Sequence, residues 1–162
     1  MLSKKVEEAL NAQINTEFWS AYFYLSISVH MESDGKPGFA KWFKAQFHEE
    51  QGHASKLIGY VITRGGKVSL APIKEVPTSW DSPLQAFEET LKHEQIVTGH
   101  INNLVALTRT ENDYATESFL KWYIDEQVEE ESTVTSIIDA LKGIDGNGLG
   151  IFLLDKELGG RQ

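Results

Sequence analysis

The sequence predicts an all-α protein: a four-helix bundle with one long crossover between its second and third helices and a short fifth helix at the C-terminus. Glycine and proline gather in a few places and divide the chain into four long segments with helical spacing of apolar residues. The first and third connections are short and the second is long, which is typical of a bundle with a single crossover. Because 162 residues can build one sizeable hydrophobic core, we expect one domain over residues 1–162.

The first two helices are predicted from the breakers that follow them. The first helix spans about Ser3 to Glu32 and is closed by the Gly- and Pro-containing segment 33–38. The second spans about Phe39 to Arg64 and stops at Gly65. Each is long enough to run the length of a bundle, about 40 Å at 1.5 Å per residue.

Proline placement predicts the crossover and the start of the third helix. The stretch from Lys67 to Asp81 contains two prolines and is expected to be extended. Ser82 then acts as a helix cap, with Pro83 in the first turn and Gln85 three residues after the cap, which is a capping-box pattern. The third helix should end near Thr110.

The fourth helix is expected to begin around Asn112 and to continue to Lys142, where Gly143 would break it. A short apolar segment from Leu149 to Leu158 predicts the fifth helix, which ends at Gly159. This segment is too rich in apolar residues for a helix exposed on a monomer, so other subunits should cover it.

Each long helix places one carboxylate at the centre of its apolar face. The four apolar faces comprise Val6, Leu10, Ile14, Ala21 and Tyr24; Phe39, Phe43, Phe47, Ala54, Leu57 and Val61; Phe87, Leu91, Ile101 and Val105; and Phe119, Tyr123, Val134, Ile137 and Leu141. The acids at their centres are Glu17, Glu50, Glu94 and Glu130, with His53 one turn after Glu50. No Lys or Arg shares these faces, and burying an unpaired carboxylate costs several kcal/mol. We therefore expect a bound cation among the acids.

The donor types indicate which metal is bound. Four carboxylates and one imidazole suit iron or manganese better than zinc, which prefers nitrogen and sulfur ligands. Five such groups fit a pair of ions. Tyr24 lies two turns beyond Glu17 on the same face, where it could hydrogen-bond a ligand, donate an electron, or be an ordinary core tyrosine.

The fourth helix adds a dense acidic run from Glu126 to Glu131. Glu126 lies close to Glu130 on the helical wheel, and Glu49 adjoins Glu50. A third, weaker metal position beside the pair is one interpretation, and a solvated acidic face is the other.

Composition excludes several function classes. The chain has 24 acidic and 15 basic residues and a formal charge of −9, which argues against a nucleic-acid partner. The absence of cysteine excludes disulfides and cysteine-ligated iron–sulfur clusters. Neither a secretion signal nor an apolar run of about 18 residues is present, so we expect no membrane partner and a cytoplasmic location.

From Leu2 to Gly159 the chain resembles the ferritin family, and its bacterial non-haem branch in particular. The family pattern falls on Glu17, Tyr24, Glu50, His53, Glu94 and Gln127. The resemblance implies that these residues, with Glu130, form a catalytic di-iron centre that oxidises Fe(II). It also implies that Glu49, Glu126, Glu129 and Glu130 hold a third iron ion.

The same resemblance implies a homo-oligomeric shell of 24 subunits that oxidises Fe(II) with dioxygen or peroxide and stores it as a ferric oxide-hydroxide mineral. Haem-binding bacterioferritins carry a second Glu-x-x-His on the fourth helix and a haem-ligating methionine. This chain has Gln127-x-x-Glu130 and Gly52 at those places, so no haem is expected. Of the two acids that line the pores of animal ferritins, Glu117 matches one and Leu120 replaces the other, which leaves the route of iron into the shell open.

Related classes fit less well. Rubrerythrins need a cysteine-bound iron module, and the starvation-type mini-ferritins lack the fifth helix. Two further alternatives are a di-iron oxygenase acting on an organic substrate and a metal-free structural bundle. The first usually has a longer chain and a second histidine, and the second would leave the core acids without a counter-charge. The number of iron atoms taken up per subunit would separate them.

Overall fold

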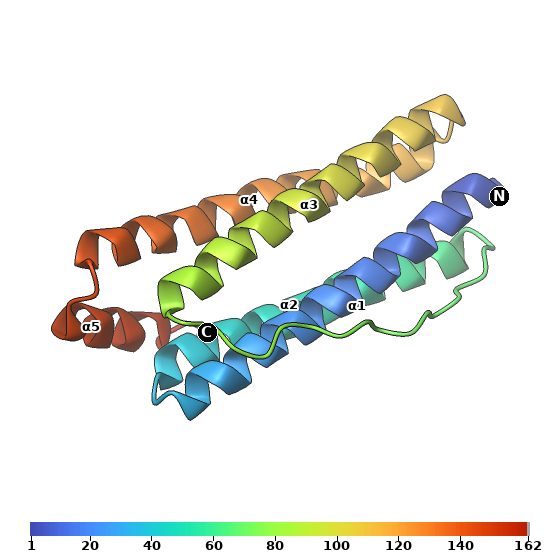
Figure 1. Ribbon diagram of the computed structural model, residues 1–162. Helices are drawn as coiled ribbons and strands as arrows, with labels where there is room; N and C mark the ends of the chain where they lie inside the picture. The colour runs from blue at the N-terminus through green and yellow to red at the C-terminus, as the bar shows by residue number, and fades with distance from the viewer. Residues whose placement is uncertain (162) are drawn as a thin grey trace.

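The computed structural model describes residues 1–161, so Gln162 of the expected domain lies outside the described residues. The described chain contains only helices, joined by turns and one extended connection (Figure 1). The helices are α1 (Lys4–Ser33), α2 (Pro37–Thr63), α3 (Pro83–Thr110), α4 (Tyr114–Ile144) and α5 (Gly148–Leu158). The predicted fold class is therefore confirmed. Among residues 1–161, no helix combines the length and hydropathy needed to span a bilayer.

Two antiparallel helix pairs, α1 with α2 and α3 with α4, form the bundle, and the crossover that joins the two pairs runs back along α1 (Figure 1). Side chains of α1 hold the crossover in place. Asn11 Nδ2 donates to the carbonyl oxygen of Lys67 at 2.9 Å, and Ser26 Oγ donates to that of Pro77 at 2.6 Å. These bonds satisfy backbone groups that an extended segment cannot pair by itself.

The predicted cap at Ser82 is confirmed, and Ser3, where the first helix was expected to begin, also acts as a cap. Ser3 accepts from the Val6 amide at the start of α1, and Ser82 accepts from the Gln85 amide at 3.1 Å at the start of α3. In a capping box the side chain of Gln85 would accept from the amide of Ser82. Here Gln85 Oε1 accepts instead from the amide of Asp81, one residue earlier, at 2.6 Å. The segment after Ser82 therefore starts as the capping pattern predicted.

Three predicted boundaries differ from the structure by two residues, and one of them is the start of α4, which lies at Tyr114 instead of around Asn112. Helix α2 begins at Pro37, two residues before Phe39, because proline suits the first helical position. Helix α4 runs through Gly143 to Ile144 instead of stopping at Lys142, since one glycine only weakens a helix. The helix ends where Asp145 takes a left-handed conformation with φ of 50°.

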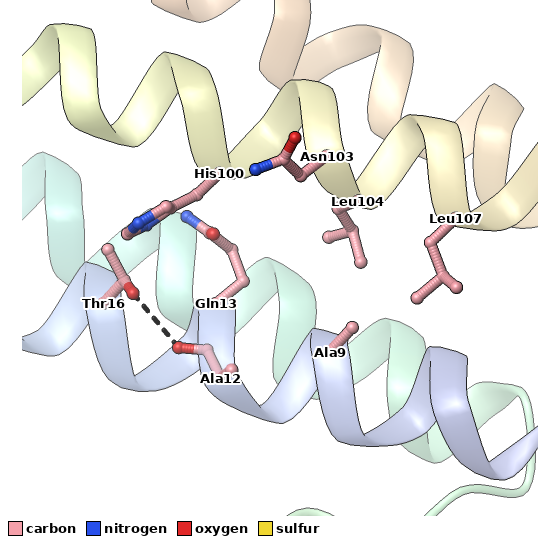
Figure 2. A pocket seen from close by; sticks show the side chains of 8 residues that line it. All are labelled: Ala9, Ala12, Gln13, Thr16, His100, Asn103, Leu104 and Leu107. Carbon is pink, nitrogen blue, oxygen red and sulfur yellow. Dashed lines mark hydrogen bonds between the residues drawn. The ribbon is translucent and has the colours of Figure 1, made fainter.

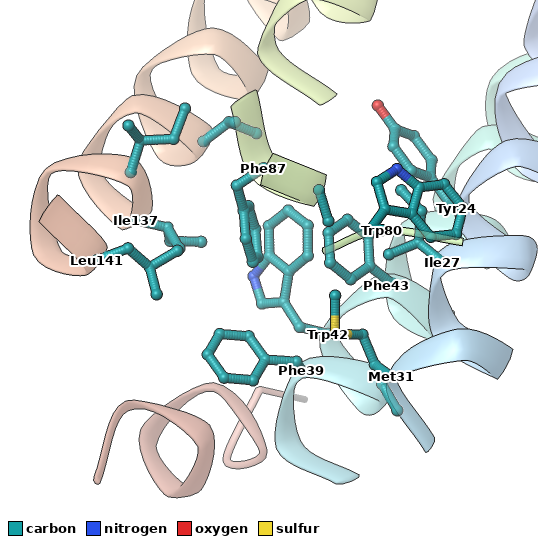
Figure 3. Packing of buried hydrophobic residues seen from close by; sticks show 14 of the residues in the cluster. Tyr24, Ile27, Met31, Phe39, Trp42, Phe43, Trp80, Phe87, Ile137 and Leu141 are labelled. Atoms are coloured by element: carbon teal, nitrogen blue, oxygen red, sulfur yellow. The ribbon is translucent and has the colours of Figure 1, made fainter. Parts of the chain in front are cut away.

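The core consists of two apolar clusters, one toward each end of the bundle, with a polar layer between them. The cluster on the α5 side is rich in aromatic rings from α1, α2 and α3, including Tyr24, Phe43 and Phe87 (Figure 3). The second cluster is mainly aliphatic. Three residues expected in the apolar faces are only partly buried and pack against the margins of these clusters: Phe47, Leu91 and Phe119.

Helix α5 packs across the start of α2 and supplies the cap that α2 lacks locally. The N-cap residue of α2, Lys36, makes no side-chain capping bond. Instead the buried carboxylate of Asp155 accepts from the Phe39 amide at 2.9 Å. Gly38 permits this approach, because a Cβ there would lie 1.6 Å from the carbonyl oxygen of Asp155. The position of α5 is therefore tied to the first turn of α2.

Candidate metal centre

The polar layer between the clusters contains every core-face acid that the sequence predicts. All the long helices contribute to it, and each of its members is at most 6% exposed: Glu17 from α1, Glu50 and His53 from α2, Glu94 from α3, and Gln127 and Glu130 from α4. No lysine or arginine is among the buried side chains of residues 1–161. The charge imbalance expected from the apolar faces is therefore present in the folded chain.

The first group of closely spaced donor atoms joins α1 and α2. Single ligand atoms of Glu17, Glu50 and His53 all lie within 4.8 Å of one another. His53 Nδ1 is 3.2 Å from Glu50 Oε2 and 3.8 Å from Glu17 Oε2. The i, i+3 spacing of Glu50 and His53 places both on the same face of α2. This spacing of two carboxylates and an imidazole allows all three to reach one ion.

The second group joins α2 and α4 and shares the same imidazole. Ligand atoms of His53, Glu126 and Glu130 lie within 4.8 Å of one another, and His53 Nε2 is 3.8 Å from Glu126 Oε1. Glu130 is also held by α2, because Gln46 Nε2 donates to its Oε2 at 2.9 Å. Two potential ion positions are thus adjacent, one on each side of the His53 ring.

Glu94 does not belong to either group. Both of its carboxylate oxygens accept hydrogen bonds, from the Tyr24 hydroxyl and from Gln127 Nε2 at 3.1 Å. Gln127 Nε2 also lies 3.1 Å from the Glu94 carbonyl oxygen. Tyr24 and Gln127 therefore orient Glu94 in this arrangement, and direct ligation by Glu94 or Gln127 stays a prediction.

Burial and mutual repulsion shift the acids toward their protonated forms. Burial raises the pKa of Glu50 well above its usual value, and the charges of Glu17 and Glu94 add to the effect. Burial and the charge of Glu94 raise the pKa of Glu130 to about 8. The pKa of Glu94 is raised mainly by burial, although its hydrogen bonds oppose the shift. Bringing a metal ion into this layer would replace these protons.

Glu17 and His53 shift in the opposite sense, toward their charged forms. Burial alone would raise the pKa of Glu17, but hydrogen bonds from His53, Glu50 and Gln13 outweigh burial and lower it. Burial alone would lower the pKa of His53, yet its hydrogen bonds to Glu17 and Glu50 raise it to about 11. The imidazolium is thus the positive charge among these buried acids in the metal-free chain.

Only part of the predicted third position is assembled. Glu126 approaches Glu130, and burial together with the charges of Glu129 and Glu49 raises the pKa of Glu126. Glu129 is exposed, and Glu49 accepts a hydrogen bond from Arg161 Nη2 at 2.8 Å. Neither residue is in a group of closely spaced ligand atoms in the described chain.

Sequence reasoning missed two buried glutamines that support the acids. Gln13 Nε2 donates to Glu17 Oε1 at 2.7 Å, and Gln46 bonds Glu130. Each is almost fully buried and lies four residues before a core-face glutamate, Glu17 or Glu50. A polar residue one turn before a core acid was the signal that could have identified them.

Gln13 also lines a surface groove between α1 and α3, about 300 Å³ in volume (Figure 2). Thr16, His100 and Asn103 are the other polar residues along this groove, and Leu104 and Leu107 line its apolar end. Since Gln13 bonds Glu17 directly, one buried amide separates the groove from the first group of metal-binding atoms.

Comparisons with known proteins agree with this architecture. The sequence profile described as "Ferritin-like domain" matches residues 7–144. The chain is 43% identical over 161 residues to a bacterial non-heme ferritin of Bacteroides fragilis (strain 638R), covering 99% of this chain and 100% of that protein. It is 38% identical over 161 residues to a bacterial non-heme ferritin of Staphylococcus aureus (strain USA300), covering 99% and 97%.

Among solved structures, an open pore ferritin from the hyperthermophilic archaeon Archaeoglobus fulgidus matches with a TM-score of 0.99 and 46% sequence identity, over 100% of both chains. A structure described as a humanized archaeal ferritin matches with the same TM-score and 44% identity, covering 100% of this chain and 98% of that one. Whole-length relatives and a matching family profile lead to one conclusion. The chain belongs to the ferritin family.

Proposed function

We propose that this chain is the subunit of an iron-storage shell and that its buried carboxylate layer is a ferroxidase centre for Fe(II). The observation that carries the proposal is the pair of adjacent donor groups that share His53, within a core that has no buried lysine or arginine among the described residues. Iron is the substrate and cargo of this centre. Oxygen donors with one imidazole accept both Fe(II) and Fe(III).

Two ions held side by side allow oxidation in a paired step. Each Fe(II) loses one electron, and dioxygen takes up both electrons with two protons to give hydrogen peroxide. Glu17 and Glu50 would hold one ion, Glu130 the other, and His53 and Glu94 would complete the two sets. Fixed positions for both ions remove the need for two independent encounters with the oxidant.

Tyr24 is proposed to orient Glu94 and to be available as an electron donor beside the pair. Its hydroxyl is fully buried and bonds the Glu94 carboxylate. Burial and the charges of Glu94 and Glu50 raise the pKa of Tyr24 well above its usual value, so the phenol remains a hydrogen-bond donor. A third ion is proposed next to Glu126 and Glu130, with Glu49 and Glu129 as its further ligands.

Assembly into a homo-oligomeric shell, with 24 subunits, is proposed from the tail. Leu149, Phe152 and Leu153 of α5 are 55–67% exposed in the isolated chain. Covering apolar side chains of this size provides about 1.5–3 kcal/mol each before the entropy cost of association. Their concentration on one short helix favours a permanent contact between copies of this chain.

Aerobic addition of Fe(II) to the purified protein tests the proposal. We expect iron to be taken up far beyond the few ions that the carboxylate layer can hold, with electron micrographs showing dense cores inside a shell. Glu50→Gln should abolish rapid oxidation, while Glu8→Gln, which removes the same charge from an exposed site, should not. Uptake that stops at two or three ions per subunit would contradict storage and favour a di-iron oxygenase.

A further inference from the structure

After α5 the chain returns to α2, where Arg161 bonds Glu49 (Figure 1 shows the ribbon of this return). Two hydrogen bonds to backbone carbonyl oxygens lie along this segment. The carbonyl oxygen of Gly159 accepts from Lys41 Nζ at 2.9 Å, and the Arg161 amide donates to the carbonyl oxygen of Leu158 at 3.2 Å. The capping bond of Asp155 holds the rest of α5 at the start of the same helix.

Arg161 uses this placement to make three contacts with α2. Its guanidinium lies 4.8 Å from the ring centroid of Trp42, and its Nη1 donates to the Trp42 carbonyl oxygen at 3.4 Å. Its Nη2 donates to Glu49 Oε2 at 2.8 Å, in a charge-assisted hydrogen bond. The Arg161 side chain is 23% exposed and that of Glu49 is 44% exposed. The guanidinium is thus held on one side by a ring and a carbonyl and directed at one carboxylate.

Glu49 is the acid that connects Arg161 to the metal layer. Glu49 adjoins the buried Glu50, and its charge contributes to the raised pKa of Glu126, after burial and the charge of Glu129. Even so, it is absent from the group formed by His53, Glu126 and Glu130. The carboxylate that could extend this group is bonded to a permanent cation instead.

We propose that Arg161 is a tethered counter-ion that competes with a metal ion for Glu49 and so sets the affinity of the outer metal position. This inference rests on the proposed function of the carboxylate layer. When an ion binds beside Glu126 and Glu130, the carboxylate of Glu49 leaves the Arg161 guanidinium and ligates the ion. When the ion leaves, the ion pair between Glu49 and Arg161 forms again. No bond other than this ion pair is broken.

The competition makes the outer position sensitive to the placement of α5. The inner group is unaffected, because Arg161 makes no contact with Glu17, Glu50 or His53 among the described hydrogen bonds and ion pairs. An exposed ion pair changes an equilibrium constant by about two- to fivefold. We therefore expect a change of this size in the affinity of the outer position when the ion pair is removed.

Zinc titration of the whole metal-free shell tests this inference, since Zn²⁺ binds without being oxidised. Isothermal titration calorimetry would compare the wild-type chain with Arg161→Gln, Arg161→Lys and Lys41→Gln. We expect Arg161→Gln to tighten the weaker binding event about two- to fivefold and to leave the tighter event unchanged. Arg161→Lys, which keeps the charge, should stay close to wild type. Lys41→Gln loosens the same tail without touching Glu49 and should also match wild type.

Zinc anomalous difference maps of crystals of the same variants show which metal position corresponds to the weaker binding event. In Arg161→Gln crystals the ion beside Glu126 should gain occupancy, with Glu49 turned toward it. Unchanged or weaker outer binding in Arg161→Gln, or an equal gain in Lys41→Gln, would overturn the inference. If the guanidinium only anchored the tail, Arg161→Gln would lower the melting temperature and leave the zinc affinity unchanged. That result would also overturn the inference. If zinc fails to bind the inner group even in wild type, the proposed function fails as well, so the two failures are distinguishable.

Discussion

Glu130→Gln should stabilise the metal-free protein at neutral pH, although it removes a proposed ligand. Burial and the charge of Glu94 raise the pKa of Glu130 from 4.5 to about 8. A carboxyl group whose pKa is higher in the folded state favours folding only while it is protonated. Its contribution to stability is therefore lost as pH rises from about 4.5 to about 8, the reverse of the usual behaviour of a salt-bridged acid.

The size of the effect follows from the shift of pKa from 4.5 to about 8. Each unit corresponds to about 1.4 kcal/mol, so the fully ionised group costs about 5 kcal/mol above pH 8 and about 3 kcal/mol at pH 7. Glutamine carries no charge, and its amide oxygen can still accept the bond from Gln46 Nε2. The substitution should therefore recover much of this cost and keep the Gln46 amide paired.

Thermal unfolding of the shell in the presence of a chelator, at one scan rate, measures the difference. We expect Glu130→Gln to melt above wild type at pH 7 to 8.5, and the two to converge near pH 4.5. Glu129→Gln is the matched control, because it removes the same charge from an exposed position one residue away. A Glu130→Gln protein that melts at or below wild type across this range would refute the account of the buried acids.

Three further outcomes are expected. Zinc binding at pH 7 should release at least two protons per centre, because the pKa of His53 is raised to about 11 and that of Glu130 to about 8, and the raised pKa of Glu50 adds to the release. Zinc affinity should therefore fall as pH is lowered. Calorimetry in two buffers of different ionisation enthalpy measures the release, and zero net release would contradict the prediction. Asp155→Ala should cost about 1 kcal/mol and expose α5 to protease, since it removes the cap of α2, whereas exposed Glu157→Ala should not; equal digestion rates would contradict this. Deleting residues 147–162 should weaken the shell or its mineral retention while each bundle stays helical and binds iron pairs; an intact 24-mer with unchanged loading and thermal stability would disprove the role of the tail.

Local signals predicted most of the fold because each acts within a few residues. The Ser82 cap with Pro83 located the start of α3, and the spacing of apolar residues located the core faces. The end of α4 was misplaced because Gly143 is tolerated within the helix. The left-handed residue that ends α4 is Asp145, two residues after that glycine.

The candidate centre was predictable where a polar residue interrupts the apolar face of a single helix. It was not predictable where a hydrogen bond or ion pair joins residues far apart in the sequence. Glu17, Glu50 and His53 were found because each interrupts an apolar face. The direction of the Gln46 amide toward α4 could not be read from the sequence, since it depends on how two helices meet. The same holds for the bond between Arg161 and Glu49, which spans 112 residues and depends on where α5 ends.

The central claim is that the buried layer holds a pair of iron ions for oxidation. Crystals soaked anaerobically with Fe(II) and measured at the iron absorption edge test it most directly. The account predicts two strong peaks ligated by Glu17, Glu50, His53, Glu94 and Glu130, and a weaker third peak beside Glu126. Iron peaks that lie away from these side chains, on the surface or in the groove between α1 and α3, would contradict it.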